Sequence, residues 1–155
     1  MLVSPPRSRL VPPLLATLCL VLGGGVAAAR IVVPAEDAIP VLASIEAAVR
    51  AGDHEAMAGL LSEHGVRVNL GPVAERTSDL TPSQAFYYFK TLFQDRQTLE
   101  FAFEKHQEVD GGRLHAVAIW RFAGPVAGPE TRQRVLFTLA HGSGGWKVTE
   151  ITAWR

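Results

Sequence analysis

Cysteine is almost absent from this sequence, which has one, Cys19, near its N-terminus. Cys19 falls within residues 1–29, a segment whose order of residues is that of a secretory signal peptide. Removal of this segment leaves a mature chain without cysteine. The mature chain is therefore predicted to have no disulfide, no thiol nucleophile and no thiolate metal site.

The signal peptide is indicated by three consecutive features: Arg7 and Arg9, the apolar stretch from Leu10 to Leu22, and the small residues Ala27 to Ala29. The apolar stretch is short for a bilayer-spanning helix, which needs about 20 residues. We therefore expect cleavage after Ala29, export to the periplasm or the medium, and no membrane contact afterwards. Cleavage removes two arginines and no acid, so the balance of 15 basic and 15 acidic residues becomes a net charge of −2.

Clustered positive charge is also lacking, because no run of lysine or arginine occurs. Nucleic-acid surfaces and polybasic membrane patches depend on such clusters, so neither partner is expected. The 5 histidines show no HxH or HExxH spacing, and neither a G-x-S-x-G motif nor a glycine-rich phosphate loop is present. No metal and no cofactor is therefore predicted.

The last third of the chain contains four segments rich in aromatic and β-branched residues, separated by glycine- and proline-rich breaks. This pattern is typical of an antiparallel meander. The predicted strands are Leu99–His106, Arg113–Phe122, Thr131–His141 and Gly145–Trp154. Hydrophobic residues make up 48% and charged residues 19% of the chain, which is a globular composition.

The segment before these strands has helical periodicity with clear end signals. Gly52 and Asp53 predict a helix end followed by a helix start, and Thr81 with Gln84 predicts a capping box. The predicted elements are helices Ile39–Arg50, His54–Ser62 and Pro82–Phe93, a short strand Val66–Leu70, and a second short strand around Val73–Arg76. Residues 30–37 read as a linker and residues 38–155 as one domain.

The predicted fold is α+β, with a curved antiparallel sheet of four long strands plus one or two short ones, and about three N-terminal helices packed on its concave face. Here the chain resembles the nuclear-transport-factor-2-like superfamily, the cystatin-like or ketosteroid-isomerase-like cone. The resemblance rests on AAVRAGDHEAMAGLLSEHGVRVNLG (Ala47–Gly71), TPSQAFYYFKTLF (Thr81–Phe93) and GGWKVTEITAW (Gly144–Trp154). It places the chain nearest to small exported bacterial domains.

The resemblance implies a pocket between the helices and the concave sheet, which in isomerase-like members holds an acidic base on the sheet. The mature aspartates do not match that base, because all fall in predicted loops or element ends: Asp37, Asp53, Asp79, Asp95 and Asp110. Glu150 is the best remaining acid, since it lies in mid-strand on the predicted face of Trp146 and Trp154. The predicted pocket residues are Tyr88, Phe89, Trp146 and Glu150.

Each catalytic candidate also has a structural interpretation. Glu150 could pair across strands with Arg132 or Arg134, and a desolvated Glu150 could act as a base. His115 alternates onto the face of Val117 and is either an ordinary core or edge residue or a partner of that base. Paired glutamates and structural histidines are much commoner than catalytic ones, so no catalytic residue is predicted.

The second strand is apolar on both faces, with Trp120 and Phe122 on one side and Val117 and Ile119 on the other. Helices cover one face, so we predict a homodimer through the other face; strong curvature within one subunit is the alternative cover. The predicted function is an exported, non-catalytic domain that binds a small apolar ligand or a protein. The alternative is an isomerase- or dehydratase-like enzyme with a carboxylate base in the cone.

Overall fold

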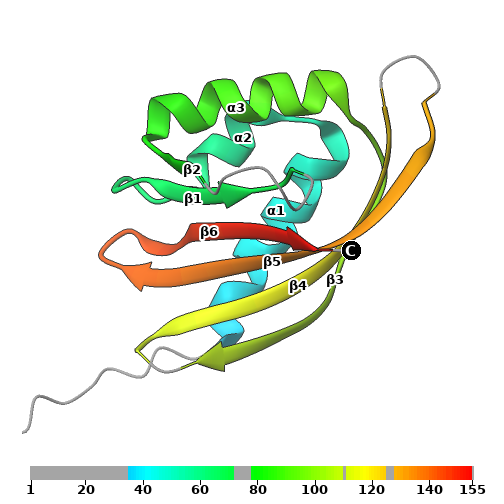
Figure 1. Ribbon diagram of the computed structural model, residues 1–155. Coiled ribbons are helices and arrows are strands. Elements are labelled where there is room, and N and C mark those ends of the chain that lie inside the picture. The colour runs from blue at the N-terminus through cyan, green and yellow to red at the C-terminus, as the bar shows by residue number, and fades with distance from the viewer. Residues whose placement is uncertain (1–34, 72–77, 110, 125–127, 155) are drawn as a thin grey trace, which may run out of the picture. The chain divides into compact units, whose positions relative to one another are not determined.

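The computed structural model describes residues 35–71, 78–109, 111–124 and 128–154 (Figure 1). The elements in chain order are η1 (Ala35–Ala38), α1 (Ile39–Ala51), α2 (His54–Gly59), β1 (Val66–Asn69), β2 (Ser78–Leu80), α3 (Pro82–Asp95), β3 (Gln97–Val109), β4 (Arg113–Ala123), β5 (Glu130–Gly142) and β6 (Gly145–Trp154). The predicted signal peptide and most of the predicted linker lie outside the described residues. Within those ranges, no helix has the length and apolarity needed to cross a bilayer.

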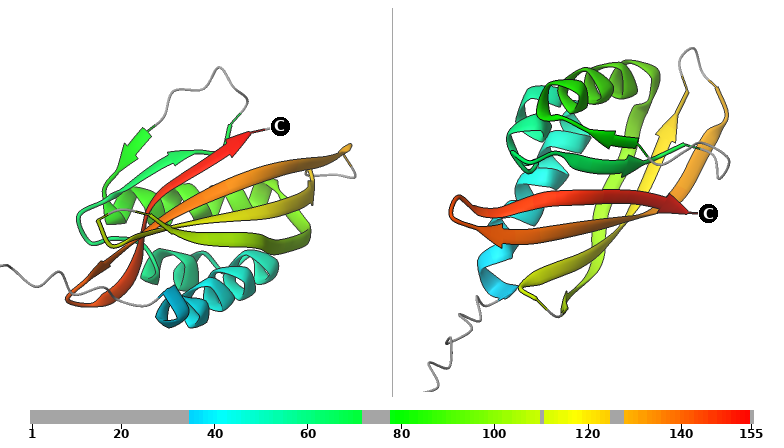
Figure 2. Two further views of the ribbon diagram at one scale, coloured as in Figure 1. Left: turned by 90° about the horizontal axis from the view of Figure 1, so that it is seen from below. Right: turned by 60° about the vertical axis from the view of Figure 1, so that its left-hand side comes forward.

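The six strands form one curved sheet in the order β2-β1-β6-β5-β4-β3. Strands β3 to β6 make the predicted antiparallel meander, while β1 pairs in parallel with β6 and antiparallel with β2 (Figure 2). The α+β class and the curved, mostly antiparallel sheet are therefore confirmed. The strand predicted around Val73–Arg76 lies outside the described residues. The structure instead has β2 at Ser78–Leu80, which is too short to show a periodic pattern in sequence.

Helix α1 ends, and helices α2 and α3 begin, at the predicted signals. Gly52 follows α1 with φ 65°, a left-handed conformation that glycine adopts without strain. The Asp53 carboxylate accepts the Ala56 N–H at the start of α2. Thr81 and Gln84 form both halves of the capping box on α3.

Helix α2 is shorter than predicted, because its last predicted turn pairs with the sheet instead. The Ser62 N–H donates to Val148 O at 2.9 Å, and the Val148 N–H donates to Leu60 O at 3.0 Å. These bonds give the chain after Gly59 partners on β6 that a continued helix would not offer. Glycine has a low helix propensity, so little is lost by ending the helix there.

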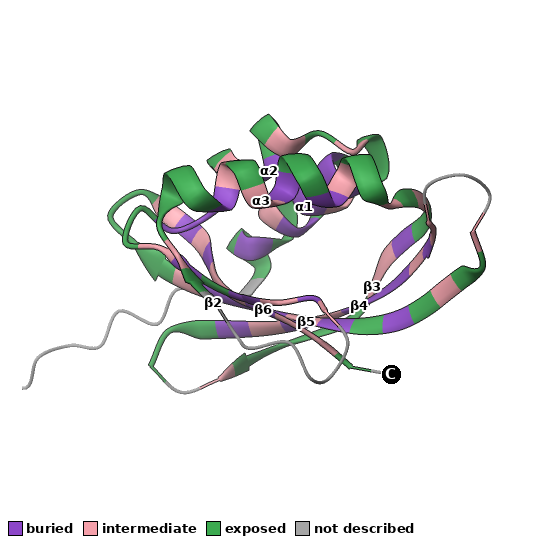
Figure 3. Ribbon diagram, turned by 45° about the horizontal axis from the view of Figure 1, so that its top comes forward, coloured by how far each residue is buried: buried purple, intermediate pink, exposed green. Residues whose placement is uncertain are grey.

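All three helices lie over one face of the sheet, which we call the inner face (Figure 3). The predicted alternation holds on the two central strands, whose inward residues are buried: Leu114, Ala116, Ala118, Trp120 and Phe122 on β4, and Val135, Phe137 and Leu139 on β5. Helix α3 contributes Phe89 and Leu92 to this core. Burial of this apolar surface is the main stabilising term of the fold.

Strand β3 lies at one edge of the sheet, and α1 covers part of that edge with two charged side chains. The Phe103 N–H donates to the Glu46 carboxylate at 2.8 Å, and the Arg50 guanidinium donates to Phe101 O at 2.7 Å. Glu46 and Arg50 also form an ion pair with each other at 3.4 Å. Backbone groups that would otherwise be open to another strand are therefore satisfied within the chain.

Candidate functional site

Aromatic side chains of the described residues pack around Phe101 between the helices and the sheet. The Phe101 ring packs edge-on against Phe103, Trp120 and Phe137, with centroid separations of 5.6, 6.5 and 6.0 Å. A cavity of about 10 Å³ remains beside them, lined entirely by apolar residues. That volume holds one water molecule at most. This part of the cone is therefore a packed core and not a ligand-sized pocket.

The four residues predicted to line one pocket do not lie together. Phe89 and Trp146 are core residues with 2% and 4% exposure, and Tyr88 is half-buried against the same core. Glu150 lies on the opposite, outer face of the sheet, because its register partners are Thr138 on β5 and Arg67 on β1. The prediction that Glu150 shares a face with Trp146 is wrong.

A β-bulge at Thr149 explains the difference. Glu150 pairs with Thr138, but the next pair along is Val148 with Leu139, so Thr149 has no register partner. The Thr149 hydroxyl donates to Thr138 O at 3.1 Å instead. One extra residue reverses the alternation of every side chain beyond it. Trp146 and Val148 therefore point inward, while Glu150 points outward.

On the outer face, Glu150 belongs to a row of side chains that crosses five strands. Register pairs place Asp79, Arg67, Glu150, Thr138 and His115 side by side on β2, β1, β6, β5 and β4. Arg67 Nε donates to Asp79 Oδ1 at 3.0 Å. That hydrogen bond and the charge of Asp79, together with the charge of Glu150, raise the pKa of Arg67 above its usual value. The row alternates in sign at its β2–β6 end.

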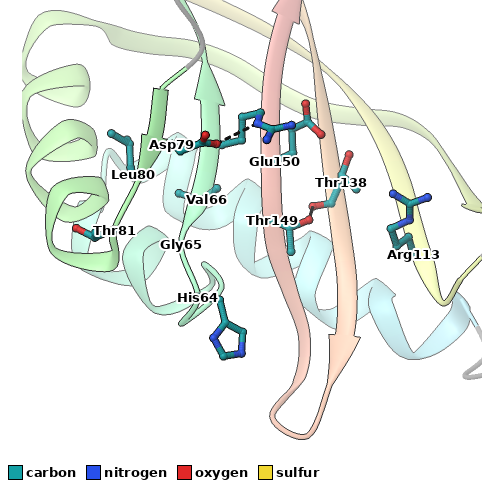
Figure 4. Close-up of a pocket in the computed structure, with 11 residues that line it drawn as sticks. His64, Gly65, Val66, Asp79, Leu80, Thr81, Arg113, Thr138, Thr149 and Glu150 are labelled. Carbon is teal, nitrogen blue, oxygen red and sulfur yellow. Dashed lines mark hydrogen bonds and ion pairs between the residues drawn. The ribbon is translucent and has the colours of Figure 1, made fainter.

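A groove of about 480 Å³ runs along this end of the row (Figure 4). Its volume lies in the range of small-ligand sites. Charged and hydroxyl side chains predominate in its lining, which consists of His64, Gly65, Val66, Arg67, Asp79, Leu80, Thr81, Arg113, Thr138, Thr149 and Glu150. Thr138 is only 5% exposed although it lies on the outer face, so the groove has depth. We call this feature the outer groove.

Gly65 allows a close approach of two backbone segments where the outer groove reaches β2. Its φ is 105°, and a Cβ added there would lie 2.8 Å from Leu80 O. A side chain at this position would therefore clash with the backbone of β2 and strain its own backbone. The close approach fixes Arg67 beside Asp79 and so shapes the groove wall.

His115 does not join Glu150 in an enclosed site. Both lie on the outer face, but Thr138 on β5 separates them, and His115 is not part of the groove lining. The exposed Tyr87, 65% accessible, and the half-buried Tyr88 belong to α3 on the other side of the sheet. A base at Glu150 acting with His115 or a tyrosine inside the cone is therefore incompatible with this geometry.

The aspartates also differ in two respects from the sequence-based prediction. Asp53 and Asp95 lie at helix ends as expected, but Asp37 lies in η1, where a linker was predicted, and Asp79 is the middle residue of β2. It points outward into the ion pair with Arg67 and not toward the core. Asp110 lies outside the described residues. Among the described residues, no group of three or more His, Cys, Asp or Glu is placed to hold a metal ion.

Sequence reasoning missed most of the outer groove. Arg67 was visible as the polar position of a short alternating strand, but nothing local indicated that Asp79 would face it. Two buried donors were also not foreseen: Gln133 Nε2 and Trp146 Nε1 have no hydrogen-bond partner among the residues that the structure describes. Trp120 Nε1 does have one, Thr98 Oγ1 at 3.1 Å.

No family model matches this chain, and no curated protein matches it. Among solved structures, a domain with a cystatin-like fold from Nostoc punctiforme is similar with TM-score 0.61 and 14% identity over 79% of each chain. The fold is nuclear-transport-factor-2-like.

Two further structures share this fold. A protein from Shewanella frigidimarina described as a "putative ketosteroid isomerase" matches with TM-score 0.60 and 17% identity, covering 76% of this chain and 94% of its own. A "putative calcium/calmodulin dependent protein kinase II association domain" from Xanthomonas campestris matches with TM-score 0.59 and 15% identity, covering 78% and 86%. Identities this low carry the fold and not the activity.

Proposed function

We propose that this chain is an exported, non-catalytic protein-interaction domain that pairs with a second copy of itself through the outer face of its sheet. The observation that carries this proposal is a cluster of apolar side chains on three adjacent strands, opposite the helices. Val117 on β4 and Leu136 on β5 are register partners and half-buried, and Trp154 on β6 is 38% exposed. We call these three residues the outer apolar cluster.

The charges around this cluster favour a second copy as the partner. Both signs are interspersed there: Arg134 pairs with Glu104 at 3.8 Å, and Arg121 bridges Glu100 and Glu130 at 2.9 and 3.0 Å. A two-fold interface brings the same patch together from both subunits. A face of one sign would repel itself in that arrangement, whereas mixed charges find opposite partners.

The inner side gives less support to the competing functions. Among the described residues, the cavity beside Phe101 holds one water molecule at most and does not admit an apolar ligand, and Glu150, the candidate base, lies on the outer face. A neighbour of the same fold is described as a kinase association domain, which is consistent with an assembly role for such a sheet. The geometry of the described residues therefore favours an assembly role over a catalytic one.

Sedimentation equilibrium of the full chain at micromolar concentration tests the pairing. We expect a dimer for the native chain and a monomer for Leu136→Glu and Trp154→Glu, because each places an unpaired charge in the interface. Tyr87→Glu is the matched control, since Tyr87 is an exposed aromatic residue on α3 away from the sheet. A native chain that sediments as a monomer would overturn the proposal.

Export is a separate part of the proposal and has its own test. It rests on the charged, apolar and small-residue order of the first 29 residues. We expect mass spectrometry of the protein recovered outside the cytoplasm to give Arg30 as its first residue. Full-length protein retained in the cytoplasm would contradict this part alone.

A further inference from the structure

We propose that Glu150 of each copy pairs with His115 of the other copy, so that a two-fold axis running along β5 relates the two. This inference rests on the proposed pairing through the outer face and deepens it, because it fixes how the two sheets are oriented. Among the described residues, Glu150 forms no ion pair, and its carboxylate accepts the Thr152 hydroxyl at 3.4 Å. Arg67 lies beside Glu150 in register but donates to Asp79 instead.

A base without a partner lies on the other side of β5. Within the described ranges, the half-buried His115 on β4 forms no hydrogen bond and no ion pair, whereas Arg121 and Arg134 are held by acids. Two strand spacings, about 10 Å, separate Glu150 from His115 within one chain. One copy therefore cannot join this acid to this base, and a second copy can.

The register of β4, β5 and β6 shows how the second copy would do so. Outward side chains of these strands form three rows: Glu150, Thr138 and His115; Thr152, Leu136 and Val117; and Trp154, Arg134 and Ile119. Two identical sheets that pack face to face with aligned strands are related by an axis that runs either along the strands or across them. The two choices bring different rows together.

An axis along β5 turns each row onto itself and exchanges β4 with β6. Trp154 then faces Ile119 of the other copy, together with the arginine stem of Arg134 that crosses β4 there. An aromatic ring thus meets apolar groups. In the same arrangement Glu150 faces His115 of the other copy, so a carboxylate meets an imidazole.

An axis across the strands at Leu136 gives a poorer match. It exchanges the first row with the third and leaves β6 facing β6. Trp154 then lies against Glu150 of the other copy, and the carboxylate is covered by an indole ring without gaining a cation. Covering a charge without a partner is costly, so the axis along β5 is favoured.

The charges around His115 make this pairing depend on pH. On its own face, Lys105 on β3 and Arg113 on β4 are positive, and Thr138 on β5 is uncharged. Glu150 of the same chain lies one strand further away. The carboxylate that approaches from the other copy therefore favours a positive imidazole. Histidine ordinarily gains its proton below about pH 6.5, so acid should tighten the dimer.

Mixing two single variants tests this geometry. Glu150→Lys places a cation opposite His115, and His115→Glu places an acid opposite Glu150. Each variant alone should therefore dimerise about tenfold more weakly than the native chain, or worse. In a mixed dimer the introduced lysine faces the introduced glutamate, and the remaining native pair faces itself. Native mass spectrometry, with one chain labelled with heavy nitrogen, should show mixed dimers in clear excess over random pairing.

Contacts within one chain cannot produce that excess, because the two changes lie in different chains. Glu108→Lys and His106→Glu are the matched controls. Both residues are exposed on β3, and their register partners Leu114 and Ala116 belong to the inner face. A mixture of these two variants should pair at random.

Sedimentation equilibrium at two pH values gives a second measurement with milder variants. The dissociation constant of the native dimer should be several-fold lower at about pH 5.5 than at about pH 8, and His115→Gln and Glu150→Gln should each remove that difference. Random pairing or no dimer in the mixture, or an unchanged pH dependence in both glutamine variants, would overturn this orientation while the native dimer still stands. A native chain that is monomeric at both pH values would overturn the proposed pairing and this inference with it.

Discussion

Two neighbouring residues of β4, Trp120 and Ile119, are both buried but by different means. Trp120 points inward, where aromatic rings pack on it and Thr98 accepts its indole N–H. Ile119 points outward, away from every helix, and is still only 7% exposed. The inner face is covered by a second layer, whereas the outer face is covered by its own side chains.

The cover over Ile119 comes from a charged pair that spans a strand. Arg134 on β5 pairs with Glu104 on β3 at 3.8 Å, and β4 lies between these two strands. The long arginine stem therefore crosses β4 close to its register partner Ile119. A strand that is apolar on both faces does not by itself require a second subunit. What remains for a partner is the outer apolar cluster.

Insertion of one alanine between Leu136 and Phe137 should have the largest effect, because it would break the distinction between the two faces. Either the side chains of β5 beyond the insertion turn to the opposite face, or the strand shifts its register on both β4 and β6. We expect the chain to lose its cooperative thermal unfolding transition. Deletion of Thr149 is the control: it removes the residue without a register partner and leaves Val148 opposite Leu139 and Glu150 opposite Thr138, so both faces stay in place. An insertion variant as stable as this deletion variant would show that strand alternation does not set the faces.

Phe101→Ala should have the next largest effect, since Phe101 is 1% exposed and three aromatic rings pack on it. We expect a loss of about 3–5 kcal/mol in the free energy of unfolding, measured by urea denaturation. Leu99→Ala on the same strand is the matched control, because Leu99 is 44% exposed, and it should cost under about 1 kcal/mol. Equal losses at the two positions would mean that the inner face is not the core.

The sequence predicts those features of this fold that depend on local signals. The capping box of Thr81 and Gln84, the Asp53 cap and the glycine stop at Gly52 each involve residues within one turn of chain. The four long strands follow from their composition and alternation. All of these appear in the structure within a few residues of their predicted bounds.

The features that the sequence does not predict depend on distant partners. The bulge at Thr149 exists only relative to the register of β5, and the early end of α2 depends on hydrogen bonds to Val148 on β6. Strict alternation is a good rule up to Val148 and is wrong by one position after it. Because of this one-residue offset, Glu150 lies in the outer groove and not in the expected pocket. Arg67 and Asp79 face each other for the same kind of non-local reason.

The smallest expected effect concerns the cover of the outer face. Arg134→Ala removes both the charge paired with Glu104 and the stem that crosses β4, whereas Arg134→Met keeps an apolar stem without the charge. An exposed ion pair contributes little, so we expect Arg134→Met to unfold like the native chain. Arg134→Ala should lose about 0.5–1 kcal/mol, because Ile119 becomes more exposed.

Urea denaturation in low salt and in 1 M salt separates the two contributions. The loss in Arg134→Ala should persist in high salt, because salt screens charges and leaves apolar contacts in place. If Arg134→Met instead loses as much as Arg134→Ala, and salt removes the difference from the native chain, the ion pair itself stabilises the outer face. In that case the apolar side chains of β4 would depend on a second subunit for their cover, as the inner face depends on the helices.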